Sequence, residues 1–447
     1  KKGLGIGFFN GVTQKMEATI LNTETGETRK EVVEPWTNYN VLVFDQRFNG
    51  NSSVSLINTN VTRDGNFRDA NATGLLWDLS NKKNTYKTFG SVKGSWVMDE
   101  GTKFGTKAEA GLEKIAGKHR FSLNGNLTTK DWDINDVGFS TKTNFANYNA
   151  WYGYRILQPT KTFNNIYLNF NLNYYHRLEP FIFQNFVFNH NNSFTDKNFR
   201  SFGGGIEFTP FGQNDIYEPR TFGRHLNVPG YFDSWVWFES DSRKKLQYNF
   251  TIDYYAFDEK GRNQVFTNFG VRYRFSDRFN VNWSFNPSFS NNETGFAGKN
   301  DTDIFIGRRQ RNTYENALTS KYTFNEKTAL ALTFRHYFSD VTYKQFYTLN
   351  QDGNLAETDL FNKNLNGTYN AWNVDLRFSW WFAPGSQLTL LYRNATSNYL
   401  ETSRLNMAKN YDMLFSEPTV NNFSLKLTYF LDYNRVKSWT KKKSVKS

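Results

Sequence analysis

Apolar and polar residues alternate strictly along much of the chain, in runs longer than ordinary soluble strands. Residues 372–382 show this pattern most clearly. The apolar positions are Trp372, Val374, Leu376, Phe378, Trp380 and Phe382, and the positions between them include Asn373, Asp375, Arg377 and Ser379. Successive side chains of a strand point to opposite faces, so the segment predicts a strand with one aromatic face and one polar face.

The same alternation recurs in many other segments, among them 4–10, 166–174, 244–257, 327–338 and 387–397. Strands with one apolar face for lipid and one polar face for a lumen, and with aromatic residues near their ends, are typical of membrane barrels. Counting such segments gives about 20 strands or more. We therefore predict an all-β fold, a transmembrane antiparallel β-barrel in the outer membrane of a Gram-negative bacterium. A soluble β-sandwich is the main alternative fold.

Two kinds of connection separate these strands. Short polar turns occur at 49–51, 81–84, 117–118, 276–278, 325–327 and 383–386. Longer polar connections occur at 130–145, 212–230, 290–311, 340–366 and 398–420. Outer-membrane barrels have short periplasmic turns and long extracellular loops, so we expect these two groups at opposite ends of the barrel.

The alternation assigns side chains to the two faces of the wall. The predicted lipid-facing residues are Trp372, Val374, Leu376, Phe378, Trp380, Leu425, Leu427 and Tyr429. The predicted lumen-lining residues are Asp45, Arg47, Asn169, Asn171, Asn173, Arg272, Arg274, Asn280, Asn282, Asp375 and Arg377.

The last predicted strand covers residues 423–433, and we assign residues 1–433 to the barrel. A basic segment, 434–447, follows and contains Lys441, Lys442 and Lys443. We expect this segment to be a solvated periplasmic tail.

Composition narrows the protein class. The 447 residues include no Cys, which excludes disulfides and thiol chemistry within the chain. The mean hydropathy is −0.69, and no apolar run approaches the roughly 18 residues of a membrane helix. Aromatic residues make up 18% of the chain, which suits two interfacial girdles.

The net charge is +12, yet the Lys and Arg residues are scattered and form no helical basic motif. We therefore expect no nucleic-acid partner. Basic residues near the outer rim can instead pair with lipopolysaccharide phosphates, and Arg on the lumen face can pair with Asp.

Several stretches resemble an uncharacterised family of Bacteroidota envelope proteins. They are residues 3–10 (GLGIGFFN), 37–74, 117–121 (GKHRF) and 132–139 (WDINDVGF). In that family a carbohydrate-binding-like β-sandwich of the family-nine type precedes a C-terminal barrel, and this chain resembles the barrel part. No export signal is visible before the first strand, which begins just after Lys1. The resemblance implies an upstream module, and further strands before Lys1 could enlarge the barrel.

Charged residues suggest two candidate sites. Segment 45–69 contains Asp45, Arg47, Arg63, Asp64, Arg68 and Asp69, which predict either a charged constriction or a structural Arg–Asp ladder inside the barrel. Asp131, Asp133 and Asp136 partly match a calcium loop. That loop lacks the Gly expected at its sixth position and the Glu expected at its twelfth, so a capped turn is the default interpretation.

The remaining motifs indicate no enzyme and no cofactor. The five His residues lack metal-ligand spacing, and His336 lies among outward positions without a partner Ser motif. Gly203, Gly204 and Gly205 fall within a predicted strand and indicate a bulge or a close backbone contact.

Two functions remain open. The polar lumen faces indicate a porin-like channel for small solutes or glycans. The long outer loops, the basic tail and the implied upstream module would also fit a structural or assembly subunit with a plugged lumen, bound to other outer-membrane proteins or lipoproteins.

Overall fold

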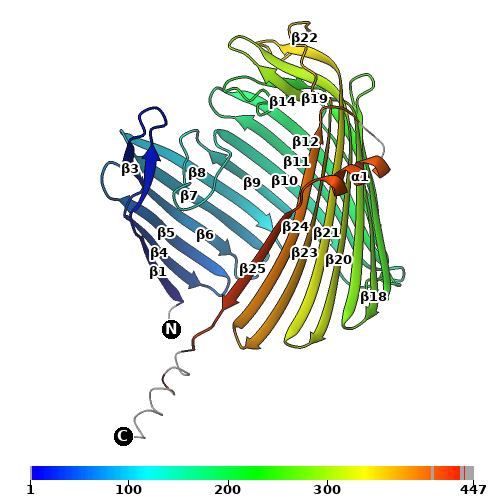
Figure 1. Ribbon diagram of the computed structural model, residues 1–447. Coiled ribbons are helices and arrows are strands. Elements are labelled where there is room, and N and C mark those ends of the chain that lie inside the picture. Colours follow the sequence, from blue (N-terminus) through cyan, green and yellow to red (C-terminus); the bar gives the residue numbers. More distant parts are fainter. Residues whose placement is uncertain (1–2, 404–406, 433–436, 438–447) are drawn as a thin grey trace.

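The computed structural model describes residues 3–403, 407–432 and 437. Nearly all of them belong to one 23-stranded sheet, beside a two-stranded sheet and one helix (Figure 1). The long strands are β1 (Leu4–Thr13), β4 (Thr37–Phe48), β5 (Ser52–Arg63), β6 (Asp69–Ser80), β7 (Tyr86–Met98), β8 (Thr102–Lys114), β9 (His119–Thr128), β10 (Phe145–Ile156), β11 (Phe163–Arg177), β12 (Ile182–Asp196), β13 (Ser201–Phe208), β16 (Tyr231–Glu239), β17 (Leu246–Phe257), β18 (Asn263–Ser276), β19 (Phe279–Lys299), β20 (Ile304–Asn325), β21 (Thr328–Leu349), β23 (Gly367–Ala383), β24 (Ser386–Leu400) and β25 (Val420–Thr428). Three short strands of the same sheet are β14 (Gln213–Asp215), β15 (Leu226–Val228) and β22 (Leu355–Glu357), and the separate hairpin is β2 (Met16–Leu21) with β3 (Thr28–Glu34).

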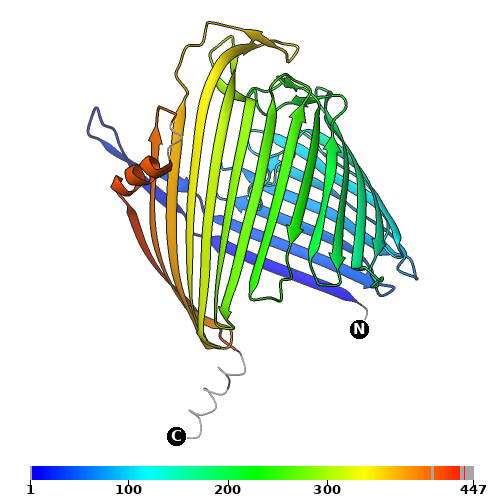
Figure 2. The same ribbon diagram turned by 90° about the vertical axis from the view of Figure 1, so that its right-hand side faces the viewer.

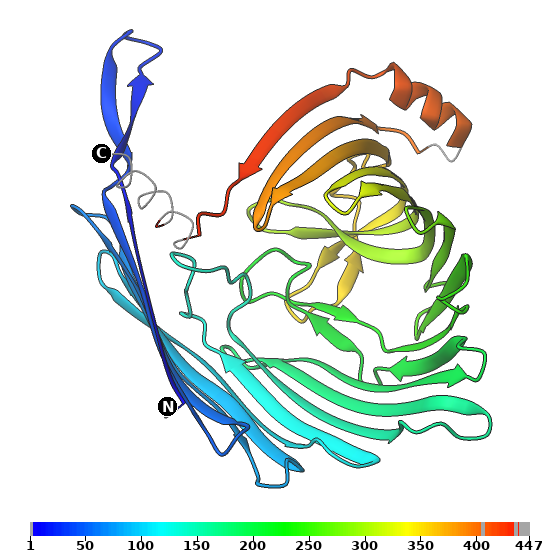
Figure 3. The same ribbon diagram turned by 90° about the horizontal axis from the view of Figure 1, so that it is seen from below.

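Each long strand pairs antiparallel with the next long strand along the chain, from β1 through to β25. Leaving the three short strands aside, the 23-stranded sheet contains twenty long strands. The predicted all-β class and strand number are therefore confirmed. The sheet curves around a central space, here called the enclosed space, which stays open on one side because in the described residues no ladder joins the edges β1 and β25 (Figure 3).

From β7 to β25 the convex face of the curved sheet is mainly apolar and the concave face mainly polar, whereas the upper convex face of β4–β6 carries hydrogen-bonded asparagines such as Asn58 and Asn71. Alternate residues of β23 and β25 lie on the convex face, and many are well exposed: Leu376 38%, Trp380 42%, Leu425 63% and Leu427 62%. Strand β25 ends at Thr428, earlier than the predicted 433, so Tyr429 lies just beyond it and stacks on Phe382. The predicted tail, 434–447, falls outside the described residues apart from Lys437.

The connections separate by length between the two ends of the sheet. Turns of a few residues join the strands at the lower end, where β1 also begins, whereas the longer loops lie at the upper end (Figures 1 and 2). The predicted loop 290–311 is largely wrong, because most of its residues extend β19 and β20, which have 21 and 22 residues. The predicted loop 340–366 begins too early, because residues 340–349 extend β21, whereas the rest connects β21 with β23 and contains only the short strand β22. The long strands β19–β21 reach about 70 Å, and their upper parts carry buried apolar residues such as Ile304, Ile306 and Leu349 beside polar ones.

Helix α1 (Met407–Ser416) lies on the convex side of β23 and β24 (Figure 2). Leu414 of this helix is fully buried, and the Phe415 ring packs edge-on against Trp372, with 5.1 Å between the ring centroids. The Tyr411 hydroxyl lies 3.0 Å from His336 Nδ1, so His336 is covered by the helix. Trp372 is on the predicted face, but α1 covers it. None of the described helices is long and apolar enough to cross a membrane.

Replacing Leu414 with Ala is expected to weaken the docking of α1 by about 2–4 kcal/mol, because a fully buried leucine is removed from the contact with the sheet. Limited proteolysis within 401–419 should then become faster. Asp412→Ala, at an exposed position of the same helix, is the matched control and should be cleaved at the wild-type rate. Equal protection of both variants would show that Leu414 does not hold the helix.

Candidate functional site

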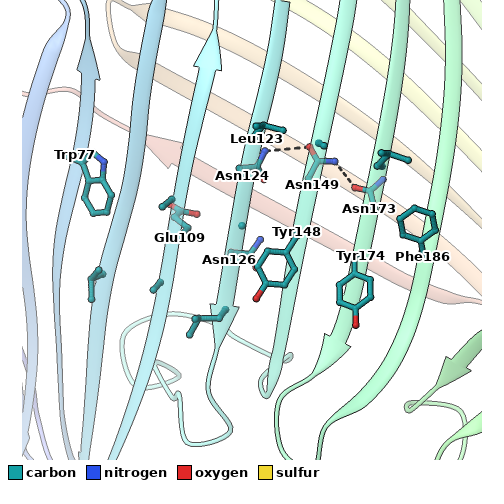
Figure 4. A pocket seen from close by; sticks show the side chains of 17 residues that line it. Trp77, Glu109, Leu123, Asn124, Asn126, Tyr148, Asn149, Asn173, Tyr174 and Phe186 are labelled. Atoms are coloured by element: carbon teal, nitrogen blue, oxygen red, sulfur yellow. Dashed lines mark hydrogen bonds between the residues drawn. The ribbon is translucent and has the colours of Figure 1, made fainter.

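Rows of asparagine side chains cross the concave face from strand to strand. Asn124 on β9 donates to Asn149 on β10 at 3.4 Å, and Asn149 donates to Asn173 on β11 at 2.6 Å (Figure 4). Directly opposed residues on neighbouring strands are close enough for such bonds. Each amide has two donors and an acceptor, so a hydrogen-bonded row still presents unused capacity to the enclosed space.

A second and a third row lie beside the first. Asn169 donates to Asn191 at 2.9 Å, and Asn171 donates to Asn189 at 3.1 Å. The predicted lumen residues Asn169, Asn171 and Asn173 therefore all lie on the concave face of β11. Asn280 and Asn282 lie on the same face of β19, where Asn282 also bonds Thr319 of β20.

The Asn189 row ends in a group of carboxylates and tyrosines. Asn189 and the Tyr231 hydroxyl both donate to the Glu207 carboxylate, the latter at 2.6 Å. Asp233 follows on β16 and is only 3% exposed. Its Oδ1 atom, like Oδ1 of Asp253 on β17, has no hydrogen-bond partner in the described part of the chain. The sequence prediction missed this group. A signal was present, because Asp233 shares its strand face with Trp235 and Trp237, whereas a lumen face is expected to be polar.

The predicted charged lumen residues also lie on the concave face, in separate places. Asp45 accepts from Ser55 at 2.6 Å and from Arg47 at 3.2 Å near the lower end. Arg272 and Arg274 donate to backbone carbonyls of the 240–245 turn.

On the opposite part of the wall, Arg393 of β24 holds Asp375 with two hydrogen bonds, at 2.6 and 2.8 Å. Arg377 lies two residues along the same concave face of β23. Asp45 and Asp375 thus pair with neighbouring arginines, and these separate places do not form a single constriction.

An ion-pair cluster ties two upper loops together. Asp136 of loop 129–144 pairs with Arg63 at 2.8 Å and with Arg68, which also contacts Asp133 at 3.1 Å. Burial alone would raise the pKa of Asp136, but hydrogen bonds and positive charge from Arg68 and Arg63 outweigh it and hold that pKa below its ordinary value. Two of the three candidate calcium ligands thus face arginine.

Within the part of the chain that the structure describes, no group of three or more His, Cys, Asp or Glu side chains is placed to hold a metal ion. Asp131, the third candidate ligand, is exposed. The loop is instead anchored by Trp132, which is 5% exposed, and by the backbone of Asp133, which donates to Ser95. The acidic segment 131–136 thus acts as a capped, ion-paired loop.

Residues 209–230 and the tips of β19–β22 form a second upper structure, here called the mouth cover. Leu226 packs with Ile304, Ile306 and Leu349 in a small buried core. Arg224 donates to the carbonyls of Leu349 and Asn350, at 2.7 and 2.8 Å. Seen from below, the cover lies within the outline of the sheet (Figure 3). The prediction treated 212–230 as a plain loop and missed these contacts.

The convex face carries a shallow depression of about 720 Å³. Large side chains border it where small ones leave room, and Figure 4 shows several of them; the residues include Trp77, Val92, Leu123, Tyr148, Leu172 and Tyr174 around Ala108, Ala110, Gly125 and Ala150. This hollow lies on the convex face of the wall and is almost entirely apolar, so it offers no chemistry for a polar solute.

Solved structures and curated proteins give little information on this chain. Among solved structures, one titled "Copper transporter OprC" is similar to the chain with a TM-score of 0.36 and 8% sequence identity, over 87% of this chain and 71% of that one. So weak a likeness carries no argument about transport by this chain. No curated protein matches the chain.

A family described as "Domain of unknown function (DUF5916)" matches residues 1–440. This match agrees with the resemblance to a family without an established activity, whereas the Bacteroidota origin and the upstream module stay predictions. Because the match spans almost the entire chain, the chain belongs to the DUF5916 family.

Proposed function

We propose that this chain is an outer-membrane β-barrel whose concave face forms a pathway for small polar solutes or glycans. One observation carries the proposal: rows of amide side chains on β9–β12 and on β17–β19 face the enclosed space, while the same strands turn aromatic and aliphatic side chains the other way. A water-filled interior needs polar walls, and lipid needs an apolar exterior. The proposal includes no catalytic step and no cofactor.

The outer-membrane location follows from the same two faces. Exposed convex residues such as Phe232 at 47% and Val236 at 55% would be costly in water but suit hydrocarbon. The long polar strands and loops at the upper end would face the cell exterior, where basic residues can contact lipopolysaccharide. The lower turns would face the periplasm.

Planar-bilayer recording tests the pathway directly. Purified protein whose gel migration changes on heating, as expected of a folded barrel, should produce discrete conductance steps in KCl. A heat-modifiable preparation that gives no steps and does not allow sugar-driven swelling of liposomes would rule out an open pathway.

The mouth cover supports a second candidate, an assembly subunit with a plugged lumen. Asn227 bonds the carbonyl of Asp352 and the side chain of Asn354, so residues 209–230 are fixed to a part of the chain far away in sequence. A loop held in this way would obstruct the enclosed space and could present a rigid outer surface to other envelope proteins.

Shortening the cover separates the two candidates. Replacing residues 212–228 with a short Gly–Ser linker should raise single-channel conductance if the wild type is an open pathway that the cover narrows. Under the plugged-subunit proposal the wild type should be silent and should co-purify with stoichiometric partners, and the shortened variant should conduct. Silence of both proteins would contradict both candidates in their stated forms.

A further inference from the structure

Strand β16 departs from the pattern of the concave face. Elsewhere that face carries mainly Asn, Ser, Thr and paired charges, but β16 places Trp235 and Trp237 there, beside Asp233. An outward position would hide these indoles in lipid, so their inward placement needs a separate explanation. The cross-strand register sets Trp235 opposite Gly205 and Trp237 opposite Gly203, both on β13.

Both indoles lie against glycine backbone. A Cβ added to Gly205 would come within 2.3 Å of Trp235 Cζ2, and one added to Gly203 would come within 3.0 Å of Trp237 Nε1. The pairings of β13 with β12 and β16 show no register shift, so the glycines do not mark a bulge. They provide the close backbone contact that the sequence also suggested, and they leave room for the two rings against the wall.

A ring packed against glycine backbone on one side has its other side toward the enclosed space. Both tryptophans are only partly buried, and no ring or cation packs on either of them in the described part of the chain. Trp151 on β10 offers a contrast, because it also lies on a glycine, Gly153, but the Arg155 guanidinium covers its ring at 5.1 Å. The two β16 indoles are therefore available for stacking.

Amide and carboxyl side chains lie on the strands around these rings. Asn191 lies opposite Gly205 on one side, and Asp253 lies opposite Trp235 on the other. Glu207 and Asp233 border the rings above. Amide donors and acidic side chains beside an aromatic face suit a neutral polyhydroxylated ligand, and this acidic group disfavours an anion.

We propose that Trp235 and Trp237 form a stacking platform for a neutral oligosaccharide that moves along the concave face. This inference rests on the proposed pathway and names its substrate class. The two residues are about 7 Å apart along the strand, so their rings can contact neighbouring sugars of one chain. The flanking amides and carboxylates would bond the sugar hydroxyls.

Binding in detergent tests the platform without requiring conduction. Maltoheptaose and xylohexaose are the probes, followed by saturation-transfer NMR and calorimetry on the full chain. We expect the double variant Trp235→Ala/Trp237→Ala to bind at least one probe about tenfold more weakly than wild type. Trp380→Ala, which removes a convex indole, should bind as wild type, and the conservative Trp235→Phe/Trp237→Phe variant should retain part of the affinity.

The possible outcomes separate the platform from the pathway. Wild-type protein that binds neither sugar, or an alanine variant that stays heat-modifiable and binds like wild type, would overturn the platform. Binding that depends on the two indoles, in a protein that never conducts, would keep the platform and reject the pathway. If the alanine variant does not fold, the phenylalanine variant decides. A stacking platform predicts that it binds sugar more weakly than wild type, whereas a purely structural role of the two indoles predicts unchanged binding.

Discussion

An arginine at Phe285 is expected to destabilise the folded barrel by about 2–4 kcal/mol, whereas an arginine at its neighbour Ser284 should change stability little. Phe285 lies on the convex face of β19, between the rings of Trp283 and Tyr314 at 6.1 and 6.3 Å. Ser284 lies on the concave face, opposite Gly270 and Ala317, and lines a polar depression of about 310 Å³. The first arginine would enter hydrocarbon, and the second would enter water.

Urea unfolding of both variants in lipid vesicles would measure this difference. Because the two substitutions are adjacent and introduce the same side chain, only the face of the strand distinguishes them. Equal destabilisation of the two proteins would contradict the assignment of the convex face to lipid, and so would a greater cost at Ser284.

Removal of the Asp136 carboxylate should have the second large effect. Asp136→Ala is expected to reduce the stability of the upper loops by about 2–3 kcal/mol, because it leaves the Arg63 and Arg68 guanidinium groups without their shared partner. Proteolysis or hydrogen exchange within 129–144 would report the loss. Asp131→Ala changes an exposed carboxylate of the same loop and should leave protection unchanged.

The same cluster predicts a dependence on pH. The arginines lower the pKa of Asp136 in the folded protein, so its stabilisation is complete above the unfolded value of about 3.9 and is lost as pH falls through the lower folded value. Protection of loop 129–144 should therefore be constant from neutral pH to about pH 5 and decline only in stronger acid. A decline centred near pH 6.5 would indicate histidine and would contradict this assignment.

Period-two alternation was enough to predict the wall. The environment of a strand residue depends first on its face, so Asn169, Asp375 and Leu376 could be placed from sequence alone. The ion-pair partners of the charged residues were harder to predict from the sequence. Asp375 is held by Arg393 across a hairpin, which is a local contact, whereas Asp136 meets Arg68 from a distant loop.

Other features depend on contacts that no local pattern encodes. The mouth cover brings Arg224 to Leu349, separated by 125 residues. Residues 290–311 are predicted as a connection because most of them are polar, yet they form extensions of β19 and β20. Trp235 and Trp237 meet Gly205 and Gly203 only through the register of β16 with β13, which the local alternation does not give.

The two unpaired edges of the sheet restrict how it can be closed. Every neighbouring pair of long strands is antiparallel, so β1 and β25, at opposite ends of a series of twenty, run in opposite directions. They can therefore pair with each other directly in the ordinary antiparallel manner. Any strands placed between them must be even in number if every pairing is to remain antiparallel, so only whole hairpins can complete this wall.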